Sequence, residues 1–322
     1  MKFVIVGGAG FIGSYIVDRL LDSGRATQVI VYDNFTAGHY WHLKDHVSDS
    51  RLIVMEHDIY DADIFDAIAG ADVTIHLAAN PDIAKAITEP DIDFRQGTAL
   101  TQIVLEAMRK GKCARILYAS GSGVYGDTGT QWVREDYSPM EPISTYGASK
   151  LACEVLLSSY CHMFGLKASC FRFGNVVGGR QTHGVAYDFL RRLKTNSAFL
   201  EILGDGSQSK PYVYVDDVVT AIFLVLDRQE KSFDVYNVAP NDFVTVKEIA
   251  GIVLEKLNIS PSECELRFGK ENRGWKGDVP IVRLITDKIR SMGWDNTYSS
   301  SEAIHRSVEA MMSNIEYLYK HA

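Results

Sequence analysis

The sequence predicts an α/β protein with a doubly wound parallel sheet, followed by a smaller C-terminal α/β substrate lobe. Short runs rich in β-branched residues alternate with helical patterns from residue 2 onward. These runs are apolar on both faces, which is typical of a parallel sheet covered by helices on both sides. After about residue 175 the loops lengthen and glycines become more frequent, so we expect the second lobe to begin there.

In the first half of the chain, strands and helices are expected in alternation. The strand candidates are KFVIVG (2–7), QVIVYD (28–33), RLIVMEHD (51–58), DVTIHLA (72–78), RILYAS (115–120) and KASCFRFG (167–174). The helical patterns between them are FIGSYIVDRLLDSG (11–24), DADIFDAIAG (61–70), TALTQIVLEAMRKG (98–111) and ISTYGASKLACE (143–154). In such a sheet, ligands bind at the carboxyl ends of the strands.

The second half contains two further strand candidates and three helical patterns. In chain order they are PYVYV (211–215), DDVVTAIFLVLDRQ (216–229), FDVYNVA (233–239), VTVKEIAGIVLEKLN (244–258) and SEAIHRSVEAMMSNIEYLYK (301–320). We expect the stretch from PYVYV to YNV to return to the main sheet. The predicted domains are therefore 1–174 with 211–239 for the main sheet, and 175–210 with 240–322 for the smaller lobe.

Composition excludes several classes of function. The chain has 322 residues, and its net charge of -8 argues against nucleic acid or an anionic membrane as the main partner. No run approaches the ~18 apolar residues of a membrane span. The first residues are typical of a strand entering a helix rather than of a signal peptide, and the five cysteines show no CxxC spacing. We therefore expect a cytoplasmic protein with free thiols.

Metal binding is not expected. The nine histidines include no pair at metal-ligand spacing on one helix. The segment HDIYDAD (57–63) contains a histidine and three carboxylates, but its pattern is more typical of a turn followed by a helix start.

The stretch GGAGFIG (7–13) lies directly between the first strand and the first helix. Gly7 allows a tight turn, Gly10 lets the backbone approach a pyrophosphate, and Gly13 lets the helix pack close to the strand. The helix N-terminus offers N–H groups and a positive dipole end to the phosphates. This order predicts a Rossmann-type dinucleotide site that contacts Gly7, Gly10, Phe11, Ile12 and Gly13.

Asp33 ends the second strand, about 20 residues after the glycines. A carboxylate at this place accepts hydrogen bonds from the adenosine ribose hydroxyls and repels a 2′-phosphate. The next residues are Asn34, Phe35 and Thr36, so no arginine is near to bind such a phosphate. The sequence therefore predicts NAD rather than NADP, with Asp33 and Asn34 beside the ribose.

Tyr146 and Lys150 are one helical turn apart in ISTYGASKLACE. A free tyrosine has a pKa of about 10, so a tyrosine base needs positive charge nearby, such as a lysine ammonium or the nicotinamide ring. A phenolate of this kind can take the proton of a sugar hydroxyl while the neighbouring carbon gives hydride to the cofactor. The spacing alone also fits simple packing, but beside a dinucleotide site it favours a catalytic pair.

These motifs together resemble the extended short-chain dehydrogenase/reductase family. The similarity is carried by GGAGFIG, Asp33, Asp58-Ile59, HLAA (76–79), VYG (124–126) and YGASK (146–150). FRFGNVVG, GDGSQ, YVYVDDV, YNV, RGWKGD and KIRSMGW follow in the family's order, so the resemblance covers almost the whole chain. Within the family, the chain is similar to nucleotide-sugar epimerases and dehydratases of the UDP-glucose 4-epimerase type.

The resemblance implies roles for further residues. Tyr146 would be the acid/base, and Lys150 would hold the nicotinamide ribose. The other implied cofactor contacts are Asp58 and Ile59 at the adenine, and Leu77, Ala78 and Ala79 along the cofactor. The implied contacts with a nucleotide sugar are Asn175, Lys210, Tyr212, Arg273 and Val282. A homodimer through the helices at 98–110 and 147–164 is also implied.

Three departures from the family pattern bear on the substrate. Gly121 stands where the family has Ser or Thr to bind the sugar's O4, so either Ser120, Ser122 or a water substitutes, or O4 is not the reacting oxygen. Phe94 replaces a usual Asn, and KPY (210–212) replaces a usual RDF. Lys210 thus keeps a positive charge but loses the two-pronged grip of an arginine on phosphate.

The stretch between Gly121 and VYG separates the family's chemistries. Dehydratases carry Asp-Glu there, because loss of water needs an acid and a base beyond the tyrosine, whereas this chain has Ser122 and Gly123. The hypothesis is therefore an NAD-dependent epimerase acting at C4 of a UDP-hexose. The alternatives are a nucleotide-sugar dehydrogenase, reductase or dehydratase, or a non-catalytic NAD sensor.

Overall fold

The computed structural model describes residues 1–60 and 64–320, with side chains up to residue 317. The chain packs as two compact units. The first unit comprises residues 1–124, 145–172 and 219–236, and the second comprises 125–144, 173–218 and 237–322. The binding roles given to the two predicted domains, with their boundaries, stay a prediction.

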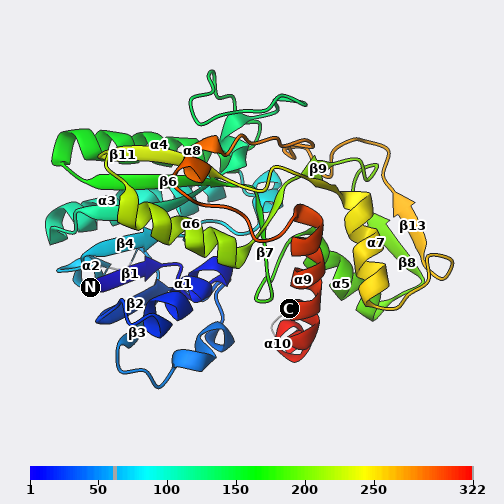
Figure 1. The fold of residues 1–322 in the computed structure, drawn as a ribbon, viewed down its shortest axis with the longest axis horizontal. Coiled ribbons are helices and arrows are strands. Elements are labelled where there is room, and N and C mark those ends of the chain that lie inside the picture. Colours follow the sequence, from blue (N-terminus) through cyan, green and yellow to red (C-terminus); the bar gives the residue numbers. More distant parts are fainter. Residues whose placement is uncertain (61–63, 321–322) are drawn as a thin grey trace. The chain divides into compact units, whose positions relative to one another are not determined.

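The first unit is built on a seven-stranded sheet with the order β11-β6-β5-β4-β1-β2-β3 (Figure 1). The pairs β1–β2, β1–β4, β2–β3 and β4–β5 are parallel. The chain moves outward from β1 in one direction and then in the other, which confirms the predicted doubly wound sheet. The strands are β1 (Lys2–Val6), β2 (Gln28–Asp33), β3 (Leu52–Glu56), β4 (Val73–His76), β5 (Arg115–Gly121), β6 (Lys167–Phe173) and β11 (Phe233–Val238).

Helices cover both faces of this sheet because its strands are apolar on both faces. Val4 and Val6 pack in one cluster with residues of α2, α3 and α4. Phe3 and Ile5 are also buried and alternate with them along β1, so they face the other side of the sheet. The helices are α1 (Phe11–Asp22), α2 (Ile64–Ile68), α3 (Leu100–Gly111), α4 (Thr145–Phe164) and α6 (Val215–Arg228). Short helical turns occur at η1 (Tyr40–His46), η2 (Ile83–Ile87), η3 (Phe94–Ala99) and η4 (Ser122–Tyr125).

Three of the expected helices differ in detail from the prediction. The pattern at 301–320 forms two helices, α9 (Ser300–Ser313) and α10 (Ile315–Lys320), which are separated at Asn314. The pattern at 98–111 is divided, because the π-helical turn η3 precedes α3 and extends it toward the N-terminus. The pattern at 61–70 appears as α2 from Ile64 onward. Residues 61–63, which end the HDIYDAD segment, lie outside the described residues.

The second unit contains three two-stranded sheets and a group of helices. β10 (Tyr212–Tyr214) pairs with β7 (Asn175–Val177), β12 (Val244–Thr245) with β9 (Ser209–Lys210), and β13 (Glu265–Phe268) with β8 (Phe199–Ile202). The helices are α5 (Val185–Thr195), α7 (Val246–Lys256), α8 (Asp287–Ser291), α9 (Ser300–Ser313) and α10 (Ile315–Lys320). Capping boxes at Thr245 with Glu248 and at Ser299 with Glu302 start α7 and α9.

The expectation that PYVYV returns to the main sheet is wrong. Its strand β10 pairs with β7 instead, and the Tyr212 N–H donates to Ser300 Oγ at the start of α9 (3.0 Å). This contact satisfies a backbone group that a sheet neighbour would otherwise bind. From the stretch 211–239, β11 alone joins the main sheet.

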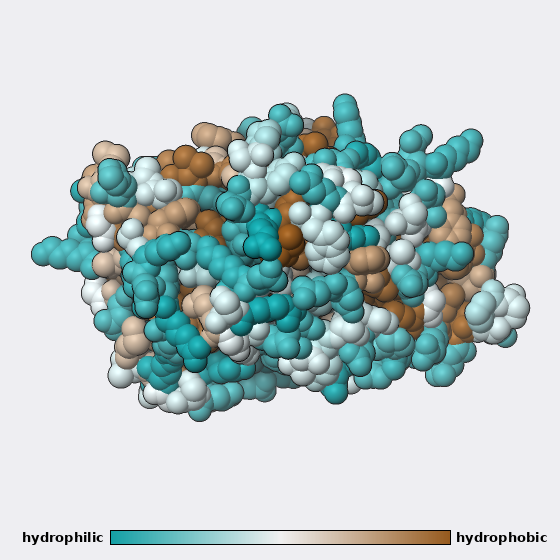
Figure 2. Space-filling model, turned by 45° about the horizontal axis from the view of Figure 1, so that its top comes forward, coloured by the Kyte–Doolittle hydropathy of each residue, from teal (hydrophilic) through white to brown (hydrophobic). Residues whose placement is uncertain are grey.

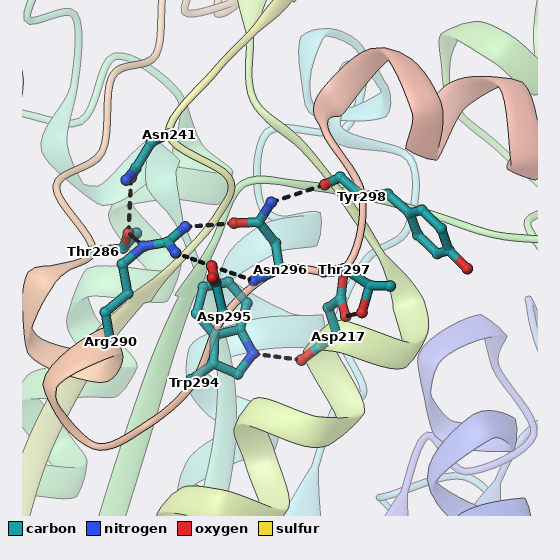
Figure 3. A network of polar contacts seen from close by, with 9 residues as sticks. All are labelled: Asp217, Asn241, Thr286, Arg290, Trp294, Asp295, Asn296, Thr297 and Tyr298. Atoms are coloured by element: carbon teal, nitrogen blue, oxygen red, sulfur yellow. Dashed lines mark hydrogen bonds and ion pairs between the residues drawn. The ribbon is translucent and has the colours of Figure 1, made fainter.

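A polar network in the second unit explains two of the family motifs (Figure 3). Asp217, of the VDDV motif, accepts hydrogen bonds from Thr297 N (2.9 Å) and Thr297 Oγ1 (2.6 Å). Trp294, which ends KIRSMGW, donates its indole N–H to the Asp217 carbonyl (2.9 Å), and Arg290 lies over the Trp294 ring. The two motifs therefore join the start of α6 to the loop before α9.

No helix in the described part of the chain is long and apolar enough to cross a membrane. On the face drawn in Figure 2, hydrophobic groups lie between hydrophilic ones. The five cysteines are buried and form no disulfide.

We expect Asp217→Ala to lower the free energy of unfolding by about 1–3 kcal/mol, because two donors of Thr297 lose a buried charged acceptor. Urea unfolding measures this change. Asp295→Ala is the control, because its carboxylate is 77% exposed in an ion pair with Arg290, and the expected loss is below about 1 kcal/mol. Equal losses in the two variants would contradict the structural role of Asp217.

Candidate active site

The glycine turn leaves no room for side chains. Gly7 has φ +83°, and a Cβ there would lie 2.7 Å from Ala78 N. A Cβ on Gly13 would lie 2.4 Å from Gly7 O and 2.7 Å from Gly8 Cα. The turn, the start of α1 and the end of β4 therefore meet backbone to backbone, as a dinucleotide site requires. Phe11 and Ile12 form the first turn of α1 beside these glycines.

Asp33 joins the end of β2 to this turn. Its Oδ2 accepts from Ala9 N (2.9 Å) and its Oδ1 accepts from Phe35 N (2.9 Å). Burial raises the pKa of Asp33, and the backbone donors oppose this shift. A Cβ on Gly38 would lie 2.9 Å from Oδ1, so a side chain at this position would collide with the carboxylate. The sequence interpretation did not include Gly38, although a glycine five residues after the aspartate was a signal for it.

The other predicted cofactor residues lie at the same strand ends. Asn34 donates to Asp58 Oδ2 (2.9 Å), and Tyr32 donates to the Asp58 carbonyl. Leu77 N and Ala78 N both donate to Val6 O (2.9 and 3.0 Å). Ile59 is buried in the core, and Ala79 is half-buried after β4. The structure thus places the predicted NAD residues at the carboxyl ends of β1, β2, β3 and β4.

Lys150 is fixed from several sides. Its side chain is buried, and Nζ donates to the Ala119 carbonyl at the end of β5 (2.8 Å). Nζ also lies 4.9 Å from the centre of the Tyr118 ring and 5.5 Å from that of the half-buried Tyr146. Burial raises the pKa of Tyr118 well above the usual value, so its ring stays neutral. The ammonium is therefore positioned next to Tyr146, as the helical spacing predicted.

Asp93 anchors the start of α4, and the sequence interpretation missed it. Its carboxylate accepts from Asn80 Nδ2 (2.9 Å) and Thr145 Oγ1 (2.6 Å), and its carbonyl accepts from Ser149 Oγ (2.7 Å). Asp93 is buried, and its two partners on α4 are the residues before Tyr146 and Lys150. No sequence pattern relates these positions, because the contacts join separate segments.

The three positions of the ASGSG stretch have different surroundings. Ser120 is buried and donates to Glu154 Oε1 (2.5 Å). Ser122 is half-buried at the start of η4, with no hydrogen-bond partner among the residues that the structure describes. A Cβ on Gly121 would meet no described heavy atom within 4 Å. The structure therefore brings Ser120 to an internal partner and leaves Ser122 with a free hydroxyl.

In the second unit, the two predicted cations converge on one carboxyl residue. Lys210 Nζ donates to Asp278 Oδ1 (2.6 Å), and Arg273 donates to the Asp278 carbonyl and to Asp127. The sequence interpretation did not assign Asp278 or Asp127, although Asp278 is part of the RGWKGD motif that it quoted. Through these contacts, the Lys210 ammonium and the Arg273 guanidinium are both held at Asp278 in the second unit.

The remaining predicted substrate residues also lie in the second unit. Asn175 and Tyr212 are direct partners in the β7–β10 pair. Burial raises the pKa of Tyr212 to about 12, and its hydrogen bond with Asn175 opposes the shift. Val282 is buried, and its N–H donates to Ser209 O (3.1 Å) next to Lys210.

His76 lies buried at the end of β4, where Nε2 meets Thr101 Oγ1 (3.0 Å). Burial, together with the nearby charge of Lys150, lowers its pKa to about 3. The imidazole is therefore neutral around pH 7. Within residues 1–60 and 64–317, no group of three His, Cys, Asp or Glu residues could hold a metal ion.

The strand order and the glycine turn define the class of this protein, a dinucleotide-binding α/β protein of the Rossmann type. The chain matches the NAD dependent epimerase/dehydratase family over residues 3–239, and it belongs to that family.

Known relatives agree with this assignment. Over 317 residues the chain is 30% identical to UDP-glucose 4-epimerase of Mycolicibacterium smegmatis, an alignment that covers 96% of this chain and 98% of that protein. The structure of UDP-glucose 4-epimerase with UDP-glucose from Thermotoga maritima has a TM-score of 0.86 at 28% identity, covering 98% of this chain and 100% of the other. A double mutant of dTDP-glucose 4,6-dehydratase from Streptomyces venezuelae, with NAD and DAU bound, has a TM-score of 0.89 at 28% identity and 98% coverage of both chains. The predicted family resemblance, fold class and cofactor are confirmed.

We expect His76→Gln to reduce the acid sensitivity of folding. The unfolded chain protonates His76 below about pH 6.5, but the folded chain does so only near pH 3. The wild-type free energy of unfolding should therefore fall as pH drops through this window, with up to about 1.4 kcal/mol per pH unit from His76. Urea unfolding between pH 7 and pH 4 should give a shallower slope for the variant.

The control for this experiment is His162→Gln, because His162 is exposed on α4. Its slope should equal that of the wild type. Equal slopes for all three proteins would contradict the neutral, buried state of His76.

Proposed function

We propose that this protein epimerises a nucleotide sugar at C4, with a UDP-hexose as substrate and a transient 4-keto sugar as intermediate. The observation that carries the proposal is the fixed position of the Lys150 ammonium beside Tyr146, in a unit that also carries the NAD residues. The similarity to UDP-glucose 4-epimerases supports the choice of substrate.

In the proposed reaction, Tyr146 takes the proton of the C4 hydroxyl and later returns it. Lys150 is proposed to hold the site in register, because its buried Nζ lies close to the Tyr146 ring and donates to the Ala119 carbonyl. NAD, which Gly7, Gly10 and Asp33 are proposed to hold, would supply the hydride acceptor and donor that the reaction needs at the sugar carbon. The ketone turns over between the two transfers, so the product is the epimer and the cofactor ends in its original state.

Epimerisation is preferred over dehydration because η4 carries no carboxylate. Its residues are Ser122, Gly123, Val124 and Tyr125, so no side chain there supplies the additional acid and base of an elimination. We propose that Ser122 binds the sugar hydroxyl, since the hydroxyl of Ser120 already donates to Glu154. The missing side chain at Gly121 keeps a nucleotide-sugar dehydrogenase or reductase as the second candidate.

The diphosphate of the substrate is proposed to bind the cations of the second unit. Lys210 and Arg273 share Asp278 as a partner, and this arrangement keeps their ammonium and guanidinium groups together. A diphosphate can replace the Asp127 carboxylate as the partner of Arg273, because both anions accept the same forked donors. Asn175, Tyr212 and Val282 are the proposed sugar contacts, and all three lie in the second unit.

We also propose a homodimer, formed through α3 and α4. Val155 and Met163 are two turns apart on one side of α4 and are 62% and 68% exposed. Phe164 adds further exposed apolar surface at the end of the same helix. A cytoplasmic location is proposed from the NAD dependence and the five buried free thiols, which suit a reducing compartment.

The reaction is tested by incubating the enzyme with UDP-, GDP-, dTDP- and CDP-sugars and analysing the products by mass spectrometry and NMR. We expect a product of unchanged mass that differs at C4, without accumulation of NADH. Tyr146→Phe should lower kcat by about 10²- to 10⁴-fold, because the proton acceptor is lost.

Tyr160→Phe, on the same helix, is the matched control and should keep kcat. Accumulation of NADH would instead identify a dehydrogenase, and loss of one water would identify a dehydratase. Full activity of Tyr146→Phe would contradict the catalytic role of Tyr146, and the absence of any conversion by the wild type would support the sensor hypothesis.

The dimer is tested by measuring the mass in solution with light scattering. Met163→Asp should halve the mass of the wild-type particle, because it buries a charge in the proposed interface. Ile53→Asp is the control, since Ile53 is an exposed apolar residue on the edge strand β3 and should not affect assembly. A monomeric wild type, or a dimer that Met163→Asp does not weaken, would contradict the proposal.

A further inference from the structure

Three residues of α4 follow one another at intervals of one helical turn, namely Tyr146, Lys150 and Glu154. Two of them bind consecutive residues at the end of β5. Lys150 Nζ donates to the Ala119 carbonyl (2.8 Å), and Glu154 Oε1 accepts from Ser120 Oγ (2.5 Å). The strand end that receives Lys150 is therefore also held by the next turn of the same helix.

Glu154 is in turn held by Arg172 on β6. Arg172 Nε donates to both carboxylate oxygens (3.0 and 3.2 Å), and Nη2 donates to Oε2 (2.6 Å). The two side chains are only 4% and 3% exposed. A buried ion pair of this kind is often no more stabilising than apolar residues of the same volume. Stability alone therefore does not explain why this ion pair joins β6 to α4, the helix that carries Tyr146 and Lys150.

We propose that Glu154 is a positioning residue, which together with Arg172 fixes Ser120 and thereby the Ala119 carbonyl that receives Lys150. The inference rests on the proposed roles of Tyr146 and Lys150. Ala119 and Ser120 share a peptide bond, so a shift of Ser120 moves the acceptor of the ammonium directly. Displacement of a catalytic group by about 1 Å can cost about a hundredfold in rate.

Three other titratable groups around this network are neutral near pH 7, because burial disfavours their charged forms. Burial raises the pKa of Cys170 on β6 and of Tyr118 on β5, and it lowers the pKa of His76 on β4. Two further thiols lie on α4: Cys153 donates to Thr101 Oγ1 (3.3 Å), and burial raises the pKa of Cys161 to about 11. Among the described residues, the charged group that contacts Glu154 directly is therefore Arg172.

The test compares Glu154→Gln and Ser120→Ala with the wild-type holoenzyme. We expect kcat to fall about tenfold to a hundredfold, and the acidic limb of the pH–rate profile to move to higher pH, because the ammonium is no longer fixed beside the phenol. The affinity for NADH, measured by fluorescence titration, should fall severalfold in both variants, because Lys150 is the proposed partner of the nicotinamide ribose.

The matched control is Ser169→Ala. Ser169 is a buried serine of β6 that donates to Gln229 Oε1 at the same distance of 2.5 Å, and among the described residues no hydrogen bond joins its side chain to α4. This variant should lose stability in the same way as Ser120→Ala, yet keep the wild-type pH profile and NADH affinity.

A second design separates positioning from stability. The double variant Glu154→Leu with Arg172→Met replaces the ion pair by apolar side chains, so its stability should return toward the wild-type level. We expect the displaced pH profile and the weak NADH binding to persist. Two results would overturn the proposal. One is that the pH profile and the NADH affinity of the double variant recover together with its stability. The other is an unchanged NADH affinity in Glu154→Gln.

Failure of the proposed reaction is a different result. In that case no sugar would be converted, or Tyr146→Phe would keep full activity. The NADH titration still tests the position of Lys150, because it does not depend on turnover.

Discussion

The Lys150 ammonium imposes a physical constraint on which the whole site depends. A buried ammonium is costly unless polar partners replace its water. Here the partners are the Ala119 carbonyl and the faces of two tyrosine rings, so the end of β5 and the start of α4 must keep one relative position. Asp93 on one side and the Glu154–Arg172 pair on the other maintain it, each through buried hydrogen bonds to α4 or β5.

The cofactor side of the site follows a different principle, namely the exclusion of side chains. Backbone meets backbone at Gly7, Gly13 and Ala78, which brings the ends of β1 and β4 together with the start of α1. Asp33 then adds a buried carboxylate that binds the same turn through Ala9. Burial raises the pKa of this carboxyl group, and the backbone N–H donors partly offset the shift. The Asp33 oxygens are therefore the acceptors at the place where the ribose hydroxyls are proposed to bind.

Much of the first unit could be predicted because its signals are local. The strands at 2–7, 28–33 and 115–120, the glycine turn and the Tyr146–Lys150 spacing each depend on residues close together in the chain. The prediction failed for PYVYV, since an apolar run of this length does not reveal its partner strand. The sequence also could not show that the Ser120 hydroxyl has an internal partner, because Glu154 lies 34 residues away along the chain.

The sequence by itself determined the strand–helix alternation, the NAD site and the family, since periodicity and short motifs encode them. Only the tertiary structure decided which side chains share a buried charge, as with Glu154 and Arg172, or Lys210, Arg273 and Asp278. The physical reason is that desolvated groups take whichever partner the packing brings within hydrogen-bond distance, and packing joins segments that no local pattern relates.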